Sequence, residues 1–429
     1  MRRIFAVAVV AASVARAEAV PPTLQDLADQ NQALKAQVEA QQKRIEQLEA
    51  RLEALERPNA APAKPAATPA SAEVEPTRPE TSALSAAAGE AAALRVSGEA
   101  GFAYFQTGRD GTYPKGEFRV DEARIYLDAP VSGSVYFHGE IDPATREASN
   151  GNLSVGGLYA EVEDLPLGLN VRAGRIDIPF GEEYERRTVM DNPLVAHSLS
   201  DLWGFDEGVE VFGSSNAFSY VASLLDGDLN SVNRAHSSLS GTVRVGYDPN
   251  STWGIGASAM RTGWLNGAQS ELSALWFANG FFVALPKATS FDADLAEFDV
   301  HAAWGKSQLR AAVGVAAYQD NGPAANRRHF TYGYIEDVQP LIDSLSASLR
   351  WSAIAVPHGY PLVGQGASGP YLFGNILTTQ LERLSFGFDY QFADPVLLKV
   401  DYSPEWGKTT NAGKRDNEQF FSTELGVKF

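Results

Sequence analysis

From Leu94 onward, apolar and polar residues alternate along a long series of segments of about ten residues each. Successive side chains of a β-strand point to opposite faces, so the alternation predicts strands with one apolar and one polar face. In the final segment the two sets are Phe421, Thr423, Leu425, Val427 and Phe429 against Ser422, Glu424, Gly426 and Lys428. Sixteen such segments are expected near residues 94–106, 117–129, 134–142, 153–163, 169–178, 207–213, 217–225, 238–247, 252–261, 294–304, 308–318, 329–336, 344–355, 379–392, 396–402 and 417–429.

The connections between these segments alternate between short and long. Short turns are expected at 130–133, 214–216, 248–251, 305–307 and 393–395, and long connections near 180–206, 262–293, 356–378 and 403–416. Transmembrane barrels have short periplasmic turns and long outer loops, whereas a soluble sandwich would not alternate so regularly. The pattern predicts an all-β fold, a 16-stranded antiparallel transmembrane β-barrel over residues 94–429. Its last strand ends at Phe429 in the periplasm, and the connection 180–206 is then an outer loop.

Residues 1–17 have the composition of a secretory signal peptide. Arg2 and Arg3 are followed by an apolar run, and Ala15-Arg16-Ala17 matches an A-x-A cleavage site. A buried N-terminal helix is the alternative interpretation. We favour export.

Residues 22–57 form an unbroken heptad pattern, which predicts an N-terminal α-helical coiled coil in the periplasm. The a positions are Leu24, Asn31, Val38, Ile45 and Leu52, and the d positions are Leu27, Leu34, Gln41, Leu48 and Leu55. Residues assigned to oligomerisation are Asn31 and Gln41 in the core and the flanking Arg44, Glu49, Arg51 and Glu56. The charged pairs favour a parallel homo-oligomer; a lone amphipathic helix lying on its own barrel is the alternative.

Residues 58–92 are rich in alanine and proline, with prolines at 58, 62, 65, 69, 76 and 79. Proline removes backbone donors and favours extended chain, so this segment is expected to be a linker. Its length could bridge part of the periplasm. Coiled coil and linker together could therefore tether the outer membrane to a periplasmic or cell-wall partner.

Sixteen strands leave an aqueous channel, so the polar parity of each strand is expected to face the lumen. On this basis the lumen-facing residues are Glu122, Arg124, His138, Glu140, Asp142, Glu161, Glu163, Arg172, Glu210, Arg244, Asp299, Arg310, Arg350, Arg383, Asp389, Asp401 and Glu424. Each of them could instead only solvate the wall or pair with a cross-strand neighbour.

Several segments resemble the phosphate-selective porin O and P family. Residues 174–181, Gly-Arg-Ile-Asp-Ile-Pro-Phe-Gly, match its G-R-x-x-x-P-F-G signature after the fifth strand. Residues 118–127 resemble the family's second strand, 136–142 its third, and 191–193 and 204–209 the segment after the signature. The resemblance implies a trimeric porin of sixteen strands, whose third loop folds inward and narrows the pore. Some members also carry an N-terminal coiled coil.

One departure from the family concerns charge. Its second strand usually runs Arg-Arg-Ala-Arg, where this chain has Asp121-Glu122-Ala123-Arg124. The first 93 residues hold 12 acids and 10 bases, which leaves 41 acids and 25 bases in the barrel. Acidic rings favour cations and basic rings favour anions, so this composition argues against phosphate selectivity.

The constriction is expected to combine both charges, as general porins do. The arginines assigned to it are Arg172, Arg175, Arg186 and Arg187, and the acids that face them are Glu182, Glu183, Glu185 and Asp191. An anion- or phosphate-selective channel built on these arginines stays open as an alternative.

Other function classes find little support. The six histidines lack metal-ligand spacing, and neither a G-x-S-x-G elbow nor a P-loop occurs, so no enzyme activity is expected. A net charge of −18 disfavours nucleic acid. No cofactor is expected, although Asp226 and Asp228 could bind calcium or bridge to lipopolysaccharide.

The sequence therefore predicts a bacterial outer-membrane porin, embedded in lipid and lipopolysaccharide and assembled as a homotrimer. Small hydrophilic solutes or ions would diffuse through a pore that loop 180–206 narrows. The alternatives are an envelope tether and an anion-selective channel.

Overall fold

The computed structural model describes residues 94–145, 153–199, 204–227, 239–266, 290–321, 327–358, 362–363, 377–409 and 413–429. The predicted signal peptide, coiled coil and linker, with their six oligomerisation residues, lie outside these ranges. No helix within the described residues is long and apolar enough to cross a membrane.

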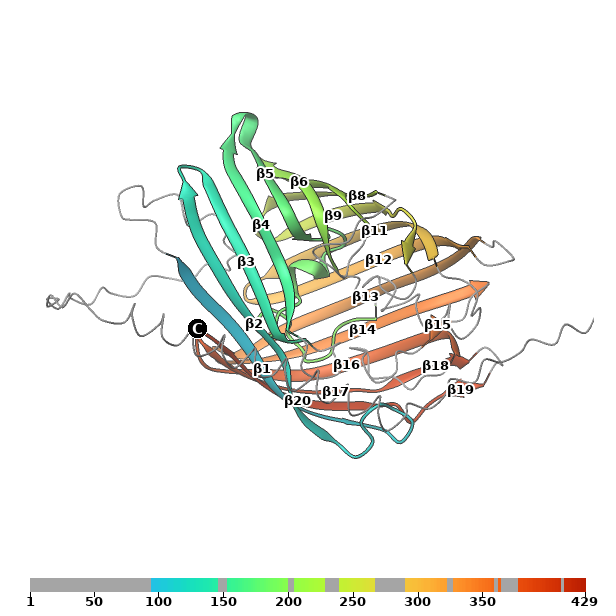
Figure 1. Cartoon of the computed structure of the whole chain (residues 1–429). Coiled ribbons are helices and arrows are strands. Elements are labelled where there is room, and N and C mark those ends of the chain that lie inside the picture. The colour runs from blue at the N-terminus through green and yellow to red at the C-terminus, as the bar shows by residue number, and fades with distance from the viewer. Residues whose placement is uncertain are drawn as a thin grey trace, which may run out of the picture. The chain divides into compact units, whose positions relative to one another are not determined.

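Sixteen long strands form a closed antiparallel barrel over the described residues (Figure 1). They are β1 (Arg95–Thr107), β2 (Glu117–Ser132), β3 (Val135–Ala144), β4 (Ser154–Leu165), β5 (Leu169–Asp177), β6 (Phe205–Ser215), β7 (Phe218–Leu225), β8 (Ser240–Asn250), β9 (Trp253–Arg261), β11 (Ser290–Trp304), β12 (Ser307–Asp320), β13 (Arg327–Ile342), β14 (Leu345–His358), β16 (Leu377–Ala393), β17 (Val396–Ser403) and β20 (Phe420–Lys428). Each corresponds to one of the sixteen predicted segments, so this prediction is confirmed.

Four short strands extend the sheet at the rim with the long loops. They are β10 (Leu265–Asn266), β15 (Leu362–Val363), β18 (Glu405–Thr409) and β19 (Lys414–Arg415). β10 pairs with β11, β15 and β18 both pair with β16, and β19 pairs with β18. They continue the outer ends of the long strands and add no further strand to the barrel wall.

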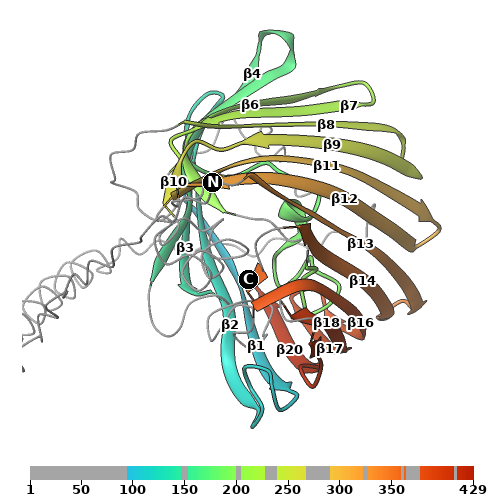
Figure 2. The ribbon, with the colours of Figure 1, turned by 90° about the vertical axis from the view of Figure 1, so that its right-hand side faces the viewer.

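The last strand closes the barrel. β20 lies between β17 and β1 and is antiparallel to both (Figure 2). Its pairing with β1 runs from Glu99 opposite Lys428 to Thr107 opposite Phe420. Beyond it, Phe429 and Gly98 exchange two backbone hydrogen bonds of 2.9 and 3.0 Å. Backbone groups have no water to bind inside a bilayer, so only a closed sheet like this one satisfies them all.

The alternation of faces follows the prediction. In β16, Phe386, Phe388 and Phe392 are 45%, 51% and 59% exposed on the outer surface. Ser385, of the opposite parity, is buried in the interior. In β20, Glu424 is only 1% exposed. The outer surface is therefore apolar and the inner one largely polar, as lipid outside and water inside require.

A β-bulge in β2 changes the expected alternation. The pairing with β1 shifts between Ala100 and Phe102, so that Asp121 and Glu122 together face a single residue of β1. Both acids are buried, at 0% and 4% exposure. A bulge places two residues against one and breaks the period of two. Strict alternation therefore put only Glu122 in the lumen, whereas Asp121 also belongs there.

The connections divide into the two expected classes. Asn216 and Gly305 adopt positive φ in the short turns after β6 and β11, where a tight reversal requires it. The connections after β5, β9 and β14 are long. The connection between β5 and β6 spans residues 178–204, is called loop three below, and contains the short 3₁₀ helix η3 (Glu183–Arg186).

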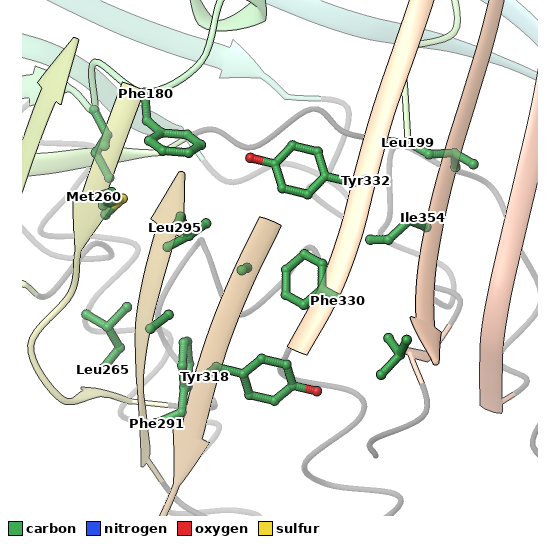
Figure 3. Close-up of a cluster of buried hydrophobic side chains, with 14 of the residues drawn as sticks. Phe180, Leu199, Met260, Leu265, Phe291, Leu295, Tyr318, Phe330, Tyr332 and Ile354 are labelled. Atoms are coloured by element: carbon green, nitrogen blue, oxygen red, sulfur yellow. The ribbon is translucent and has the colours of Figure 1, made fainter. Parts of the chain in front are cut away.

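One side of the barrel interior is apolar (Figure 3). The wall contributes Met260 of β9, Phe330 of β13 and Ile354 of β14, and loop three contributes Phe180 and Leu199. All of them are at most 4% exposed. Apolar burial against the wall gives loop three a preferred side of the barrel. The alternation predicted a polar interior throughout, whereas this side of the interior is filled by apolar side chains.

The depth of a residue in the lipid should set its tolerance to charge. We expect Phe386→Arg to destabilise the barrel by about 2–4 kcal/mol, because it places arginine on the outer surface near the middle of β16. Phe392→Arg, the same change next to a turn, should cost about 0–1 kcal/mol. Equilibrium unfolding in lipid vesicles measures both values. Equal costs would contradict the assigned membrane depth.

Candidate functional site

Loop three turns into the barrel directly after β5. The N–H of Ile178 donates to the carbonyl of Gly204 at 2.9 Å, and that of Phe180 donates to Ile178 at 2.8 Å. Gly181 follows with φ of 78°, and a Cβ there would lie 2.8 Å from Oε1 of Glu297 on β11. The backbone angle favours glycine at this position, because residues with a Cβ are strained at this φ.

Glu182 is the centre of the contact between loop three and the wall. Its carboxylate accepts hydrogen bonds from Arg186 in η3, at 3.0 and 3.1 Å, and from Arg310 of β12 and Tyr334 of β13. Arg186 also donates to Glu336 of β13 at 3.1 Å. Burial alone would raise the pKa of Glu182, but the guanidinium groups of Arg186 and Arg310 hold that pKa well below its usual range.

Further wall side chains bind the backbone of loop three. Arg350 of β14 donates to the side-chain oxygen of Asn192 at 2.8 Å and to the carbonyl of Ala196 at 2.7 Å. Asp401 of β17 accepts the N–H groups of Val195 and Ala196 at 3.1 and 3.0 Å. Additional contacts of this kind are Arg383 to His197, Lys399 to Val189, Ser352 to Leu199 and Glu99 to Met190.

Glycines on the inner wall let loop three lie close against it. A Cβ at Gly426 of β20 would come within 2.8 Å of Val189 and 3.1 Å of Met190. A Cβ at Gly387 of β16 would come within 2.8 Å of Leu194. Together with the polar contacts, these approaches hold loop three against β9 to β17, β20 and β1. Most side chains that line the open part of the lumen come instead from β1 to β8.

A cavity of about 740 Å³ lies between loop three and this open wall. Loop three contributes Tyr184, Glu185, Arg187, Thr188, Met190 and Asp191 to its lining. The strands contribute Glu99, Arg124, Tyr126, His138, Glu140, Asn170, Arg172, Asp177, Phe205, Glu210, Phe212 and Arg244, with Lys428 and Phe429 near the end of β20. The lining is charged on both sides, which makes this cavity the candidate pore constriction.

Two wall arginines of the cavity are each held by two carboxylates. Arg172 of β5 lies 3.0 Å from Glu161 of β4 and 3.4 Å from Glu210 of β6. Arg124 of β2 lies 3.4 Å from Glu140 and 3.6 Å from Glu122. Arg124 and Arg172 therefore each form ion pairs with two carboxylates of the wall.

Aromatic rings fix the orientation of Arg172. Its guanidinium carbon lies 4.8 Å from the ring centre of Tyr159 and 4.4 Å from that of Phe212, so the group is flanked by two rings. Tyr159 in turn stacks on His138 at 4.8 Å. Cation–π contacts and ion pairs act together here, and Arg172 is consequently a fixed part of the wall.

The residues predicted for the constriction divide into two groups. Arg172, Glu185, Arg187 and Asp191 line the cavity. The other four lie elsewhere: Glu182 and Arg186 bind the opposite wall, Glu183 accepts a hydrogen bond from Ser198, and Arg175 binds the carbonyl of Val155 and Glu207. The structure therefore does not bring the predicted arginines and acids together as two facing rows.

The predicted lumen residues also divide. Arg310, Arg350 and Arg383 hold loop three in place. Arg244 pairs with Asp299, with Nη2 and Oδ1 3.1 Å apart, and His138 lies 2.7 Å from Asp128. The remaining predicted lumen residues are half-buried or buried. Among them, Asp389 of β16 lies opposite Ser346 of β14 on one side and opposite Lys399 of β17 on the other.

Sequence reasoning missed some residues of the site. Lys399 has the parity of Asp401, which the alternation placed in the lumen, so the same signal could have found it. Tyr159 and Phe212 also have lumen parity, so the alternation could have found them as well. Asp121 carried no signal, since a bulge is not visible in the pattern. Among the described residues no group of three or more acidic or histidine side chains could hold a metal, and Asp228 lies outside them.

Neither a protein-family model nor a curated protein matches this chain. Solved structures do. The outer membrane channel DcaP of Acinetobacter baumannii is 12% identical, with 79% of this chain and 97% of that chain covered at a TM-score of 0.55. OmpT of Vibrio cholerae is 11% identical, with 80% and 98% covered at 0.54, and OprB of Pseudomonas putida is 9% identical, with 78% and 94% covered at 0.51. At such identities the likeness shows the fold alone: a barrel of the outer-membrane porin type.

The Glu182 contacts should control the position of loop three. We expect Glu182→Gln to destabilise the protein by about 3–5 kcal/mol, because it removes one charge from a buried network. Glu185→Gln, three residues along and facing the cavity, is the matched control and should have a small effect. Equilibrium unfolding in vesicles measures the stability of each variant, and single-channel current noise measures how firmly loop three is held. Identical behaviour of the two variants would contradict the anchoring role.

The same contacts should withstand mild acid. A carboxylate whose pKa is lowered on folding stabilises the folded state fully above its ordinary pKa, here 4.5, and loses this effect only as the pH falls further. Single-channel noise should therefore stay constant from pH 7 to about pH 5. An increase in noise already near pH 6 would show that other groups hold the loop.

Proposed function

We propose that this chain is a bacterial outer-membrane porin, through which small hydrophilic solutes or ions diffuse passively. The observation that carries the proposal is the cavity of about 740 Å³ inside a closed barrel, lined by charged side chains on both sides. An apolar outer surface fits lipid, and a charged inner cavity fits water. A barrel of sixteen strands is wide enough for an aqueous channel.

Loop three supports selective diffusion rather than an open tube. It is bound to one side of the interior by the Glu182, Arg350 and Asp401 contacts, which leaves the passage along β1 to β8. Because the contacts are numerous and buried, the width of the passage is set by a fixed partition. We propose that the cavity is the narrowest part of the pore and excludes larger solutes by size.

We further propose a homotrimer with the coiled coil of residues 22–57 in the periplasm. The unbroken heptads support self-association. One of the similar structures, OmpT of Vibrio cholerae at a TM-score of 0.53, is described as a trimer form. The resemblance of residues 174–181 to the porin O and P signature also supports this assembly.

A tethering role is the second candidate function. The heptads followed by a proline-rich linker support it, since such a segment could reach a periplasmic or cell-wall partner. It does not compete with permeation, because the cavity lies within the barrel. Deleting residues 20–92 separates the roles: lost envelope attachment with intact trimers indicates a tether, and dissociated trimers indicate an assembly device.

Purified protein should show stepwise conductance in planar bilayers, because a fixed water-filled passage conducts ions as soon as it inserts. The substitution Gly426→Leu should change the size of the steps, since a side chain there meets Val189 and Met190 of loop three and displaces the loop from the wall. Protein that inserts in folded form but carries no current would refute the porin function.

A further inference from the structure

We infer that the pore prefers cations, and that the carboxylates paired with Arg124 and Arg172 set this preference. The inference rests on the proposed porin function and names the charge class of its solutes. It runs against the phosphate selectivity of the family that residues 174–181 resemble.

Several cations of the lumen are engaged with loop three and do not face the passage. Arg186 binds Glu182 and Glu336, Arg310 binds Glu182, and Arg350 binds Glu336 and the loop backbone. Arg383 and Lys399 bind loop carbonyl groups as well as Glu405 and Glu424. The sequence assigned three of these arginines to the lumen, but none of the five lines the cavity. Their attraction for a passing anion is thereby removed from the passage.

The cations that do line the cavity are outnumbered by acids. They are Arg124, Arg172, Arg187, Arg244 and Lys428, and the lining acids are Glu99, Glu140, Asp177, Glu185, Asp191 and Glu210. Glu122, Glu161 and Asp299 lie behind the lining and pair with its arginines. With these three, nine carboxylates surround the passage against five cations. A permeating ion therefore meets a negative potential.

The pairing geometry decides the effect of the two wall arginines. Arg172 lies between Glu161 and Glu210, and Arg124 lies between Glu122 and Glu140, so each guanidinium has two carboxylates within 3.6 Å. With both of its carboxylates ionised, each group of three carries a net negative charge. The rings of Tyr159 and Phe212 prevent Arg172 from swinging out toward a solute. An arginine in the pore wall thus acts as part of an acidic surface.

The β-bulge in β2 strengthens this arrangement. It turns both Asp121 and Glu122 inward. Glu122 pairs with Arg124, and Asp121 pairs with Arg119 at 3.5 Å.

Reversal potentials in a KCl gradient across a planar bilayer test the inference. For the unmodified protein we expect K⁺ to permeate better than Cl⁻ by a factor on the order of 10. One net negative charge about 5 Å away raises the K⁺ concentration and lowers the Cl⁻ concentration about fourfold each in water, and salt screens part of this effect. Inorganic phosphate at millimolar concentration should not block the current. A preference for Cl⁻, or block by phosphate, would overturn the inference.

Two sets of variants assign the effect to residues. The double variant Glu161→Gln and Glu210→Gln leaves Arg172 without its acids and should lower the permeability ratio severalfold, toward one. If that variant does not fold, Asp191→Asn on loop three provides a second test and should lower the ratio about twofold. The matched control is Asp343→Asn, a 97% exposed turn carboxylate paired with Lys306, which should leave the ratio unchanged.

The outcomes separate the two proposals. Folded protein without any conductance refutes the porin function itself. Conductance with equal K⁺ and Cl⁻ permeability refutes only the cation preference. Equal shifts in the ratio for Asp191→Asn and Asp343→Asn would show that overall charge, rather than the cavity, sets the preference.

Discussion

The pairing of β20 with β1 is the constraint on which the rest of the structure depends. A sheet in hydrocarbon cannot leave an edge unpaired, so sixteen strands must close on themselves. Closure places β1 and β17 on either side of β20. Glu99 of β1 and Lys399 of β17 therefore lie on neighbouring parts of the wall, and both bind the backbone of loop three. The open side, and therefore the passage, is what remains along β1 to β8.

Most of the barrel could be predicted from the sequence because the alternation of apolar and polar residues has a direct physical cause. Lipid and water select opposite faces of every strand, and each of the sixteen predicted segments is a strand in the structure. The bulge at Asp121 and Glu122 could not be predicted, because one extra residue shifts the parity without changing the composition.

The site was less accessible to sequence reasoning. Alternation tells which face a residue lies on, but not which part of the interior it faces. Arg350 and Arg172 have the same parity and the same chemistry, yet the first holds loop three and the second lines the cavity. The difference arises from the path of loop three, which depends on contacts between residues more than 100 positions apart, such as Arg186 with Glu336. The pattern of residues along one strand does not indicate which distant residues will be in contact.

The apolar cluster beneath loop three has a consequence for how the barrel assembles. Phe180, Met260 and Ile354 belong to one packed unit although they come from distant parts of the chain. Contacts of such long sequence separation form slowly, since loop entropy must be overcome before they stabilise anything. These contacts are therefore expected to form late, after the neighbouring strands of the wall have paired. Loop three then fills one side of a wall that is already in place, and the water path is the space that it leaves empty.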